Sequence, residues 1–523
     1  MKIMKNLKYT LVIPALLFLM AGCVNEDDLV QVDPNLDTNA SFWKTDNDAL
    51  AGVNAVYGSL MTDGTYMRST PLMLDLTGDD TRSNSPWVNM ANVGRFNSQT
   101  GDPAIYGWAF ETYYQGIYRA NQVLQYVPAI EMQDPELKNR ILGQAYFMRG
   151  LYFFHLVNLF RNVPLPLDNN TIYHEQKTQE EGWVQIKSDF QKAADLLPVS
   201  YVGLTGLDSG QKGRATKGAA LGYLGKAFLF THDYANAKAA FESVINLGVY
   251  SLVSNYKDNF TTTNENNSES IFEVQFSRET GGGVDLGWGG TPVASWGQAT
   301  ARAITYGPRG FGYTDVQPTV TLFNEFHNEL TVSGQVDPRL DATIFYNKPG
   351  GMTLYGKDFA TYYAASPTDL NDFFCAKYQN AGGEFADEFD WRSGINERLM
   401  RYSDILLMYA ECLNETGATA AAYPYIQLVR SRANLPDLST TRPGMTQQQM
   451  RDQLAHERFL EFALEGHRFD DIRRWGWLEN PSKLAELKIR DPEFNTYSPG
   501  REYFPIPLLE MDTNPGIVQN PGY

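Results

Sequence analysis

Flat aromatic side chains in two loop-like segments are the residues of this 523-residue chain best suited to ligand binding. The first segment, residues 79–96, places Trp87 among polar side chains, and the second, residues 281–313, carries tryptophans and tyrosines between glycines. An indole or phenol ring stacks on the apolar C–H face of a sugar, while amide and charged groups bind the hydroxyls. The candidate ligand-binding residues are therefore Arg82, Trp87, Asn89, Trp288, Trp296 and Tyr313.

These rings have an alternative role, because aromatic side chains in loops also fill the core of the loop region itself. Proline, glycine and serine flank Trp87, Trp288 and Trp296, so a buried regular element is not expected around them. We therefore expect the three tryptophans to contribute to a binding surface, and the core interpretation stays open for each ring.

The sequence lacks the residue patterns of the common catalytic and metal sites. It has no Gly-x-Ser-x-Gly, no His-Glu-x-x-His and no cysteine pair at zinc-binding spacing, so we expect no catalytic residue, metal ion or cofactor. The neighbouring carboxylates Asp79–Asp80 and Asp387–Glu388 could serve glycoside hydrolysis, which uses two carboxyl groups at a defined separation. With 61 acidic residues in the chain, chance accounts for such neighbours. A surface glycoside hydrolase remains the alternative to a binding protein.

The N-terminus has the pattern of a lipoprotein export signal. Three lysines precede the apolar run 11–20, and small residues lead directly to Cys23. That run is about half of the ~20 residues that a bilayer-spanning helix needs. We therefore predict a signal peptide at residues 1–22, lipidation of Cys23 and attachment of the mature chain to a membrane. The acidic stretch after Cys23 resembles the tether that directs some lipoproteins to the outer face of the outer membrane.

The charge argues against a protein that binds polyanions, and the cysteine content argues against a fold held by disulfides. The formal net charge is −18, and removal of the leader leaves 40 basic and 61 acidic residues, or −21. Nucleic acid and other polyanions are therefore not expected partners. Beyond Cys23 only Cys375 and Cys412 remain, so no disulfide framework holds an exported chain of this size. Cys412 lies in an apolar helical run, where a free buried thiol is expected.

A repeated spacing of small and bulky residues predicts paired helices. Two segments, residues 216–248 and 401–434, share steps of 12, 4 and 3 between packing residues, which place a small side chain where antiparallel helices cross closely. The first set is Gly225, Ala237, Phe241 and Val244, and the second is Ala410, Ala422, Ile426 and Val429. Two more pairs are expected from residues 136–160 with 183–197 and from residues 46–61 with 106–127.

The fold class predicted is mainly α, a tetratricopeptide-like scaffold of about four helical hairpins with a large loop-rich lobe containing short strands. The helical repeats are expected at about 41–61, 105–248 and 398–466, and the lobe at about 62–104 and 250–397. A short strand is expected at residues 270–276, and an extended C-terminal tail at residues 500–523.

Four phrases along the chain resemble the hallmarks of the SusD/RagB family. They lie at residues 144–154 continuing to Val163, at residues 401–411, at residues 457–476, and from Pro505 to the C-terminal residue. The third of them reads ERFLEFALEGHRFDDIRRWG. The phrases appear in order from the leader to the last residue, so the resemblance covers essentially the whole chain.

The resemblance implies a cell-surface, outer-membrane lipoprotein that captures glycans and delivers them to a partner, a TonB-dependent transporter of the SusC type. It also implies that the helical hairpins face the transporter and that the lobe carries the ligand surface. The expected ligand is a neutral oligosaccharide or polysaccharide, and a peptide-binding member of the same family is the alternative. The charged residues of the hallmark phrases are expected to form ion pairs between helices: Arg149, Glu457, Glu461, Arg468, Asp470 and Arg473.

Overall fold

The computed structural model describes residues 42–170, 174–278, 298–381 and 391–523. Cys23 with its leader, Trp288, Trp296 and the Asp387–Glu388 pair lie outside the described residues. The chain divides into a unit at Met1–Lys44 and a unit at Thr45–Tyr523, and the fold below is that of the second unit.

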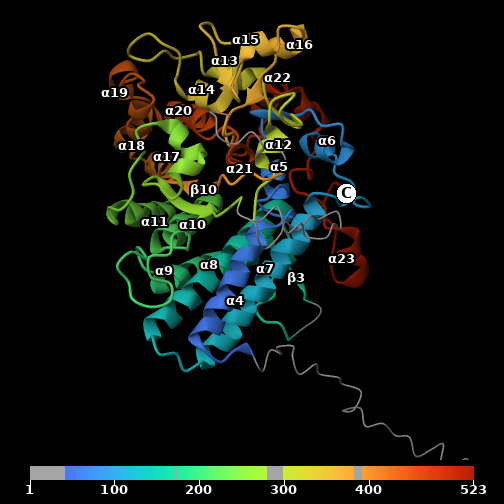
Figure 1. Ribbon diagram of the computed structural model, residues 1–523, viewed down its shortest axis with the longest axis vertical. Coiled ribbons are helices and arrows are strands. Elements are labelled where there is room, and N and C mark those ends of the chain that lie inside the picture. Colours follow the sequence, from blue (N-terminus) through green and yellow to red (C-terminus); the bar gives the residue numbers. More distant parts are fainter. Residues whose placement is uncertain (1–41, 171–173, 279–297, 382–390) are drawn as a thin grey trace, which may run out of the picture. The chain divides into compact units, whose positions relative to one another are not determined.

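The first two helical pairs form the lower part of Figure 1, where long helices lie side by side. Helix α4 (Asp46–Gly58) packs on α7 (Tyr106–Tyr126), and α8 (Pro135–Phe160) packs on α9 (Gln179–Leu196). Thr45 and Thr178 begin α4 and α9 with capping boxes, in which the threonine hydroxyl accepts a backbone N–H three residues on. Both predicted pairs are confirmed.

The other two pairs confirm the spacing argument. Helix α10 (Lys217–Phe230) packs on α11 (Tyr234–Asn246), and α17 (Tyr402–Glu415) packs on α18 (Thr419–Arg432). A Cβ atom at Gly225 would lie 2.5 Å from the ring of Phe241, so only glycine permits this crossing without rearrangement. The equivalent residues Ala410 and Ala422 of the other pair are fully buried.

Four further helices of the described residues follow α18 and lie between the last hairpin and the C-terminal tail. Helix α20 (Gln447–Glu461) begins with a capping box at Thr446 and packs on α17 and α18. Its apolar residues Phe459 and Leu460 share a core with Leu322 and Leu340 of the lobe. The neighbouring elements are α19 (Leu438–Thr441), α21 (Arg468–Arg474) and α22 (Pro481–Arg490).

Short helices, some of them labelled at the top of Figure 1, build the lobe. They are α5 (Ser69–Asp75), α6 (Val88–Gly94), α12 (Arg302–Tyr306), α13 (Val320–Glu325), α14 (Arg339–Thr343), α15 (Phe359–Tyr362) and α16 (Pro367–Leu370). Single 3-10 turns occur at Ser59–Met61, Val127–Ala129, Tyr256–Phe260, Thr262–Asn264 and Pro492–Thr496.

All strands of the described residues pair in twos and run antiparallel. The predicted strand near residues 270–276 is β4 (Ser270–Val274), which pairs with β10 (Glu397–Arg401) directly before α17. The other pairs are β1 (Thr81–Ser83) with β5 (Val316–Pro318), β2 (Val163–Pro164) with β3 (Gln176–Lys177), β6 (Ile344–Phe345) with β9 (Phe374–Cys375), and β7 (Thr353–Leu354) with β8 (Lys357–Asp358).

The C-terminal tail docks on the end of α8. The N–H of Phe504 donates to Leu159 O at 2.8 Å, and the Asn520 amide donates to Phe160 O and Phe504 O. The sequence predicts an extended tail, and the structure adds one short helix, α23 (Leu508–Thr513). Within the residues that the structure describes, no helix combines the length and apolar character needed to cross a bilayer.

Arg149, Glu457, Glu461 and Arg468 form buried ion pairs between elements, as predicted. Arg473 instead pairs with Asp470 within α21, so the prediction is wrong for those two residues. Glu461 on α20 pairs with Arg339, Arg401 and Arg432, and Arg149 on α8 pairs with Asp189 on α9 at 2.7 Å. Burial alone raises the pKa of Glu461, but the three arginines outweigh burial and hold that pKa below its usual range. These residues therefore fix how hairpins and lobe meet.

Candidate ligand-binding site

Three tryptophans surround one arginine on the α5–α7 side of the lobe. The guanidinium carbon of Arg68 lies 5.6 Å from the ring centroids of Trp87 and Trp108 and 5.3 Å from that of Trp391. Tyr313 extends the group, since its ring centroid lies 5.9 Å from that of Trp391. We call Trp87, Trp108, Tyr313 and Trp391 the aromatic cluster.

Helices that pack on one another and the segments beside them position the four rings. Trp87 is the residue before α6, and its N–H donates to the Ser85 hydroxyl at 3.2 Å. Trp108 lies in the first turn of α7, and α5 packs on both α6 and α7. Tyr313 precedes β5, and its N–H donates to Ile304 O at 2.8 Å. The four rings thus come from segments far apart in the sequence.

Arg68 is held under the rings by a buried carboxylate. Its guanidinium makes two hydrogen bonds to Asp63, at 2.5 and 2.6 Å, and both side chains are buried. A guanidinium fixed in this way attracts the electron-rich ring faces, so it sets their orientation. Burial also raises the pKa of Asp315 beside the cluster, with Ser85 and Arg68 acting in the opposite direction.

The cluster leaves aromatic surface open to a ligand. Tyr313 is 55% exposed, and Trp87, Trp108 and Trp391 are half-buried. Trp87 and Trp108 lie 5.9 Å apart between ring centroids and are tilted by only 30°, whereas Tyr313 meets Trp391 at 63°. Such an array of differently oriented flat faces suits successive rings of an oligosaccharide.

The sequence-predicted residues fall into three groups. Trp87 and Tyr313 belong to the aromatic cluster, and Trp288 and Trp296 lie outside the described residues. Arg82 on β1 is exposed and donates to the Gln317 side chain at 3.3 Å, and no described contact joins it to the cluster. Asn89 is half-buried in the first turn of α6.

Sequence reasoning missed Trp108 and Trp391. Trp108 lies in a helical run, where an aromatic residue is normally assigned to the core. Trp391 lies in the irregular segment before β10 and has a positive φ of 77°. The criterion that selected Trp87, an aromatic ring in irregular backbone, also fits Trp391 and could have found it.

Two further side chains of the predicted segments 79–96 and 281–313 have structural roles. Tyr306 is buried, and its hydroxyl donates to the Asp75 carboxylate at 2.8 Å. Asp79 is fully buried in ion pairs with Arg468 and Arg490, which lower its pKa although burial by itself raises it. The neighbouring Asp79–Asp80 carboxylates are therefore closed to a glycan substrate.

No group of three or more potential metal-ligating side chains that could hold a metal ion occurs within the described ranges. The four rings of the aromatic cluster can stack on a ligand, and the Tyr313 hydroxyl can hydrogen-bond to it.

Comparison with known proteins assigns the fold. The family model described as "SusD family" matches residues 268–523, and the model described as "Starch-binding associating with outer membrane" matches residues 36–229. The chain belongs to the SusD family. Its mainly α fold is that of solved family members.

Relatives of the SusD family span nearly the whole chain. SusD-like protein P25 of Formosa agariphila is 26% identical over 96% of this chain and 97% of its own length. The structure of a SusD superfamily protein from Bacteroides vulgatus is 28% identical, with a TM-score of 0.75 over 92% of this chain and 100% of that chain. A laminarin-binding SusD-like protein is 27% identical, with a TM-score of 0.74 and the same coverage.

Proposed function

We propose that this SusD-family protein binds a neutral oligosaccharide at the aromatic cluster, without catalysis, and passes it to a membrane transporter. The observation that carries the binding proposal is the ring of three tryptophans around Arg68, with Tyr313 open to solvent. Its support from relatives is the starch-binding description of one matching family model and the laminarin-binding neighbour.

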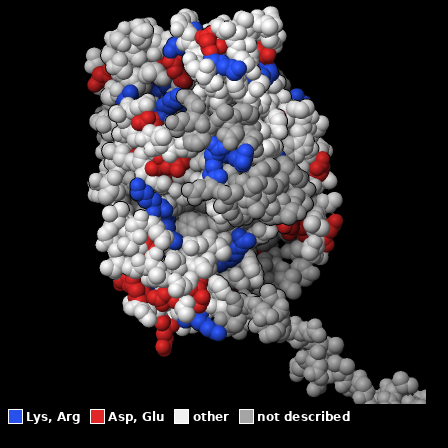
Figure 2. Space-filling model, viewed as in Figure 1, with Lys and Arg blue, Asp and Glu red and all other residues white. Residues whose placement is uncertain are grey.

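Charge supports a neutral ligand. The chain carries a formal charge of −18, which opposes polyanionic glycans at long range. Figure 2 shows basic and acidic side chains interspersed over much of one face, with acidic ones gathered at the lower ends of the helical hairpins. The expected affinity follows from the buried area. A surface that stacks a few sugar rings gains only a few kcal/mol of binding free energy, at ~25 cal/mol per Å² of buried apolar surface. We therefore expect micromolar or weaker affinity.

The second part of the proposal concerns location and partner. We propose that lipidated Cys23 anchors the protein at the outer face of the outer membrane and that a TonB-dependent transporter of the SusC type receives the glycan. The family description places its members in association with the outer membrane, and the leader sequence before Cys23 supports a lipid anchor.

The binding site is tested by removing one ring at a time. Trp391→Ala and Tyr313→Ala should each weaken the binding of laminarihexaose or another bound glycan by about 1 to 3 kcal/mol in calorimetry. Tyr118→Ala is the matched control, because Tyr118 on α7 is 49% exposed and lies outside the cluster. If Trp391→Ala and Tyr313→Ala both bind the glycan as tightly as Tyr118→Ala does, the site is wrong.

The hydrolase alternative has its own readout. Incubation of the purified protein with oligosaccharides should produce no new reducing ends while binding remains measurable. Appearance of products that depends on the protein would replace a binding role with an enzymatic one. A peptide ligand would instead leave every glycan unbound.

A further inference from the structure

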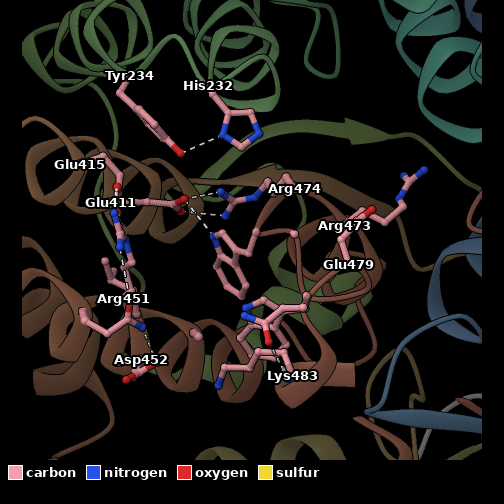
Figure 3. Close-up of a pocket in the computed structure, with 17 residues that line it drawn as sticks. His232, Tyr234, Glu411, Glu415, Arg451, Asp452, Arg473, Arg474, Glu479 and Lys483 are labelled. Atoms are coloured by element: carbon pink, nitrogen blue, oxygen red, sulfur yellow. Dashed lines mark hydrogen bonds and ion pairs between the residues drawn. The ribbon is translucent and has the colours of Figure 1, made fainter. Parts of the chain in front are cut away.

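A pocket lies among the helices, lined by residues other than those of the aromatic cluster. It has a volume of about 610 Å³ and is bordered by the turn between α10 and α11, the end of α17, the start of α20, and the segment from α21 to α22 (Figure 3). Its size lies within the range of small-molecule sites.

Two indole rings form part of its wall. Trp475 and Trp477 are half-buried, with ring centroids 5.4 Å apart and planes tilted by 39°. The indole N–H of Trp475 donates to Glu411 at 3.0 Å, which holds that ring in place. Flat faces fixed in a concave wall are the feature that a sugar ring stacks on.

The charged groups of the pocket largely neutralise one another. Glu415 binds Arg451 with two hydrogen bonds, at 2.6 and 2.7 Å, and Glu411 is paired with Arg474. The lining holds equal numbers of basic and acidic side chains, namely Arg451, Arg473, Arg474 and Lys483 against Glu411, Glu415, Asp452 and Glu479. An ionic ligand would have to break these pairs, whereas a neutral polyhydroxylated ligand can hydrogen-bond to them in place.

Neutral polar groups complete the lining. The Tyr234 hydroxyl lies 3.0 Å from His232 Nδ1, and burial together with Glu411 and Glu415 raises the pKa of Tyr234 to about 12. This hydroxyl is therefore protonated at neutral pH and can donate as well as accept. Gln448 and Asn480 add amide groups at the rim.

We propose that this pocket is a second saccharide-binding site, which takes a neutral sugar unit between the Trp475–Trp477 wall and the paired charges of α17 and α20. It binds independently of the aromatic cluster because the two sites share no lining residue. One chain would then hold a glycan at two places, which strengthens the capture of long chains through effective concentration.

The test uses the full-length protein solubilised in mild detergent and four neutral probes: laminarihexaose, maltohexaose, xylohexaose and mannohexaose. A Trp87→Ala/Trp391→Ala variant removes the first site, and calorimetry should detect residual, weaker binding of at least one probe. Adding Trp475→Ala should reduce that residual affinity at least tenfold, and Trp475→Phe, which keeps a ring, should retain part of it. Absence of residual binding for all four probes would overturn the proposal.

A second variant separates binding from folding. Gln448 is exposed at the pocket rim, so Gln448→Trp obstructs the pocket without removing a buried contact. It should abolish the residual binding while the melting temperature stays unchanged. Unchanged residual affinity in Gln448→Trp would refute the second site. If Gln448→Trp instead reduced only the co-purification of a membrane protein, the pocket would be a protein contact and the proposal would be wrong.

Discussion

At the scale of single residues, buried charge organises both the site and the scaffold. Arg68 pairs with Asp63 and lies against three indoles, so one ion pair fixes the geometry of the aromatic cluster. Asp79 and Asp80, adjacent in sequence, have opposite electrostatic environments. Asp79 is paired with Arg468 and Arg490, whereas the Asp80 carboxyl group accepts the N–H of Leu464 and lies near Asp75.

The contrast between these two carboxyls gives a pH prediction. Burial, with the nearby Asp75, raises the pKa of Asp80 to about 7. The folded state then holds a proton that the unfolded state releases near pH 4, so stability from this group is present below about pH 4 and lost as pH rises to about 7. Asp80→Asn keeps an acceptor for Leu464 N–H, and should raise the free energy of unfolding relative to wild type more at pH 7.5 than at pH 5.

Asp79→Asn is the matched control, because the pKa of Asp79 is lowered by its two arginines. Asp79→Asn should lower the free energy of unfolding at both pH values, because it leaves the guanidinium groups of Arg468 and Arg490 without their carboxylate. Urea titrations at both pH values measure the two effects. If Asp80→Asn raised the free energy of unfolding equally at pH 5 and pH 7.5, the pKa of Asp80 would not be raised.

At the scale of elements, the helix contacts that follow a repeated sequence spacing could be predicted. The contacts that bring together isolated residues of distant segments could not. The steps of 12, 4 and 3 from Gly225 correctly gave the crossing of α10 and α11, because close helix packing imposes a residue size at each step. The aromatic cluster was only half predictable. Trp87 and Tyr313 stand out in irregular backbone, but their proximity to Trp108 and Trp391 depends on tertiary contacts that no local pattern encodes.

The hairpin crossing yields a stability prediction. Gly225→Ala adds a Cβ 2.5 Å from the Phe241 ring and should destabilise the fold by about 1 to 3 kcal/mol, because the crossing helices are forced apart. Gly58→Ala on α4 is the control, since its Cβ meets no atom closer than 4.0 Å and should be neutral or slightly stabilising. Denaturant unfolding compares the two, and equal stabilities would show that the crossing tolerates a methyl group.

At the scale of the whole molecule, the leader, hairpins and lobe have separate tasks in the proposed function. The lobe and adjoining α7 carry the aromatic cluster, while the hairpins present long helical surfaces. Extended helical-repeat surfaces commonly serve protein contact. This division predicts that anchoring, ligand binding and partner binding can each be disrupted alone.

Anchoring is the first of these. Cys23→Ala removes the thioether-forming side chain and should release a folded, glycan-binding protein from the membrane fraction, because the rest of the mechanism needs no lipid. Fractionation without detergent, followed by a glycan-binding assay of the soluble fraction, measures both properties. Persistent membrane association of the variant would contradict the lipid anchor.

Partner binding is the second, and in the proposed function it determines whether the bound glycan is transported. We expect the gently solubilised protein to co-purify with a TonB-dependent transporter through an interface well above the ~1,000 Å² of a specific complex. Photo-crosslinkers at exposed hairpin positions, Val184 on α9 and Leu428 on α18, should capture the transporter, because the hairpins are expected to face it. Val332 in the lobe, 68% exposed, is the matched control and should capture little. Capture from Val332 alone would show that the lobe, not the hairpins, faces the transporter. Capture from none of the three positions, with the transporter present in the same membranes, would show that the complex does not form.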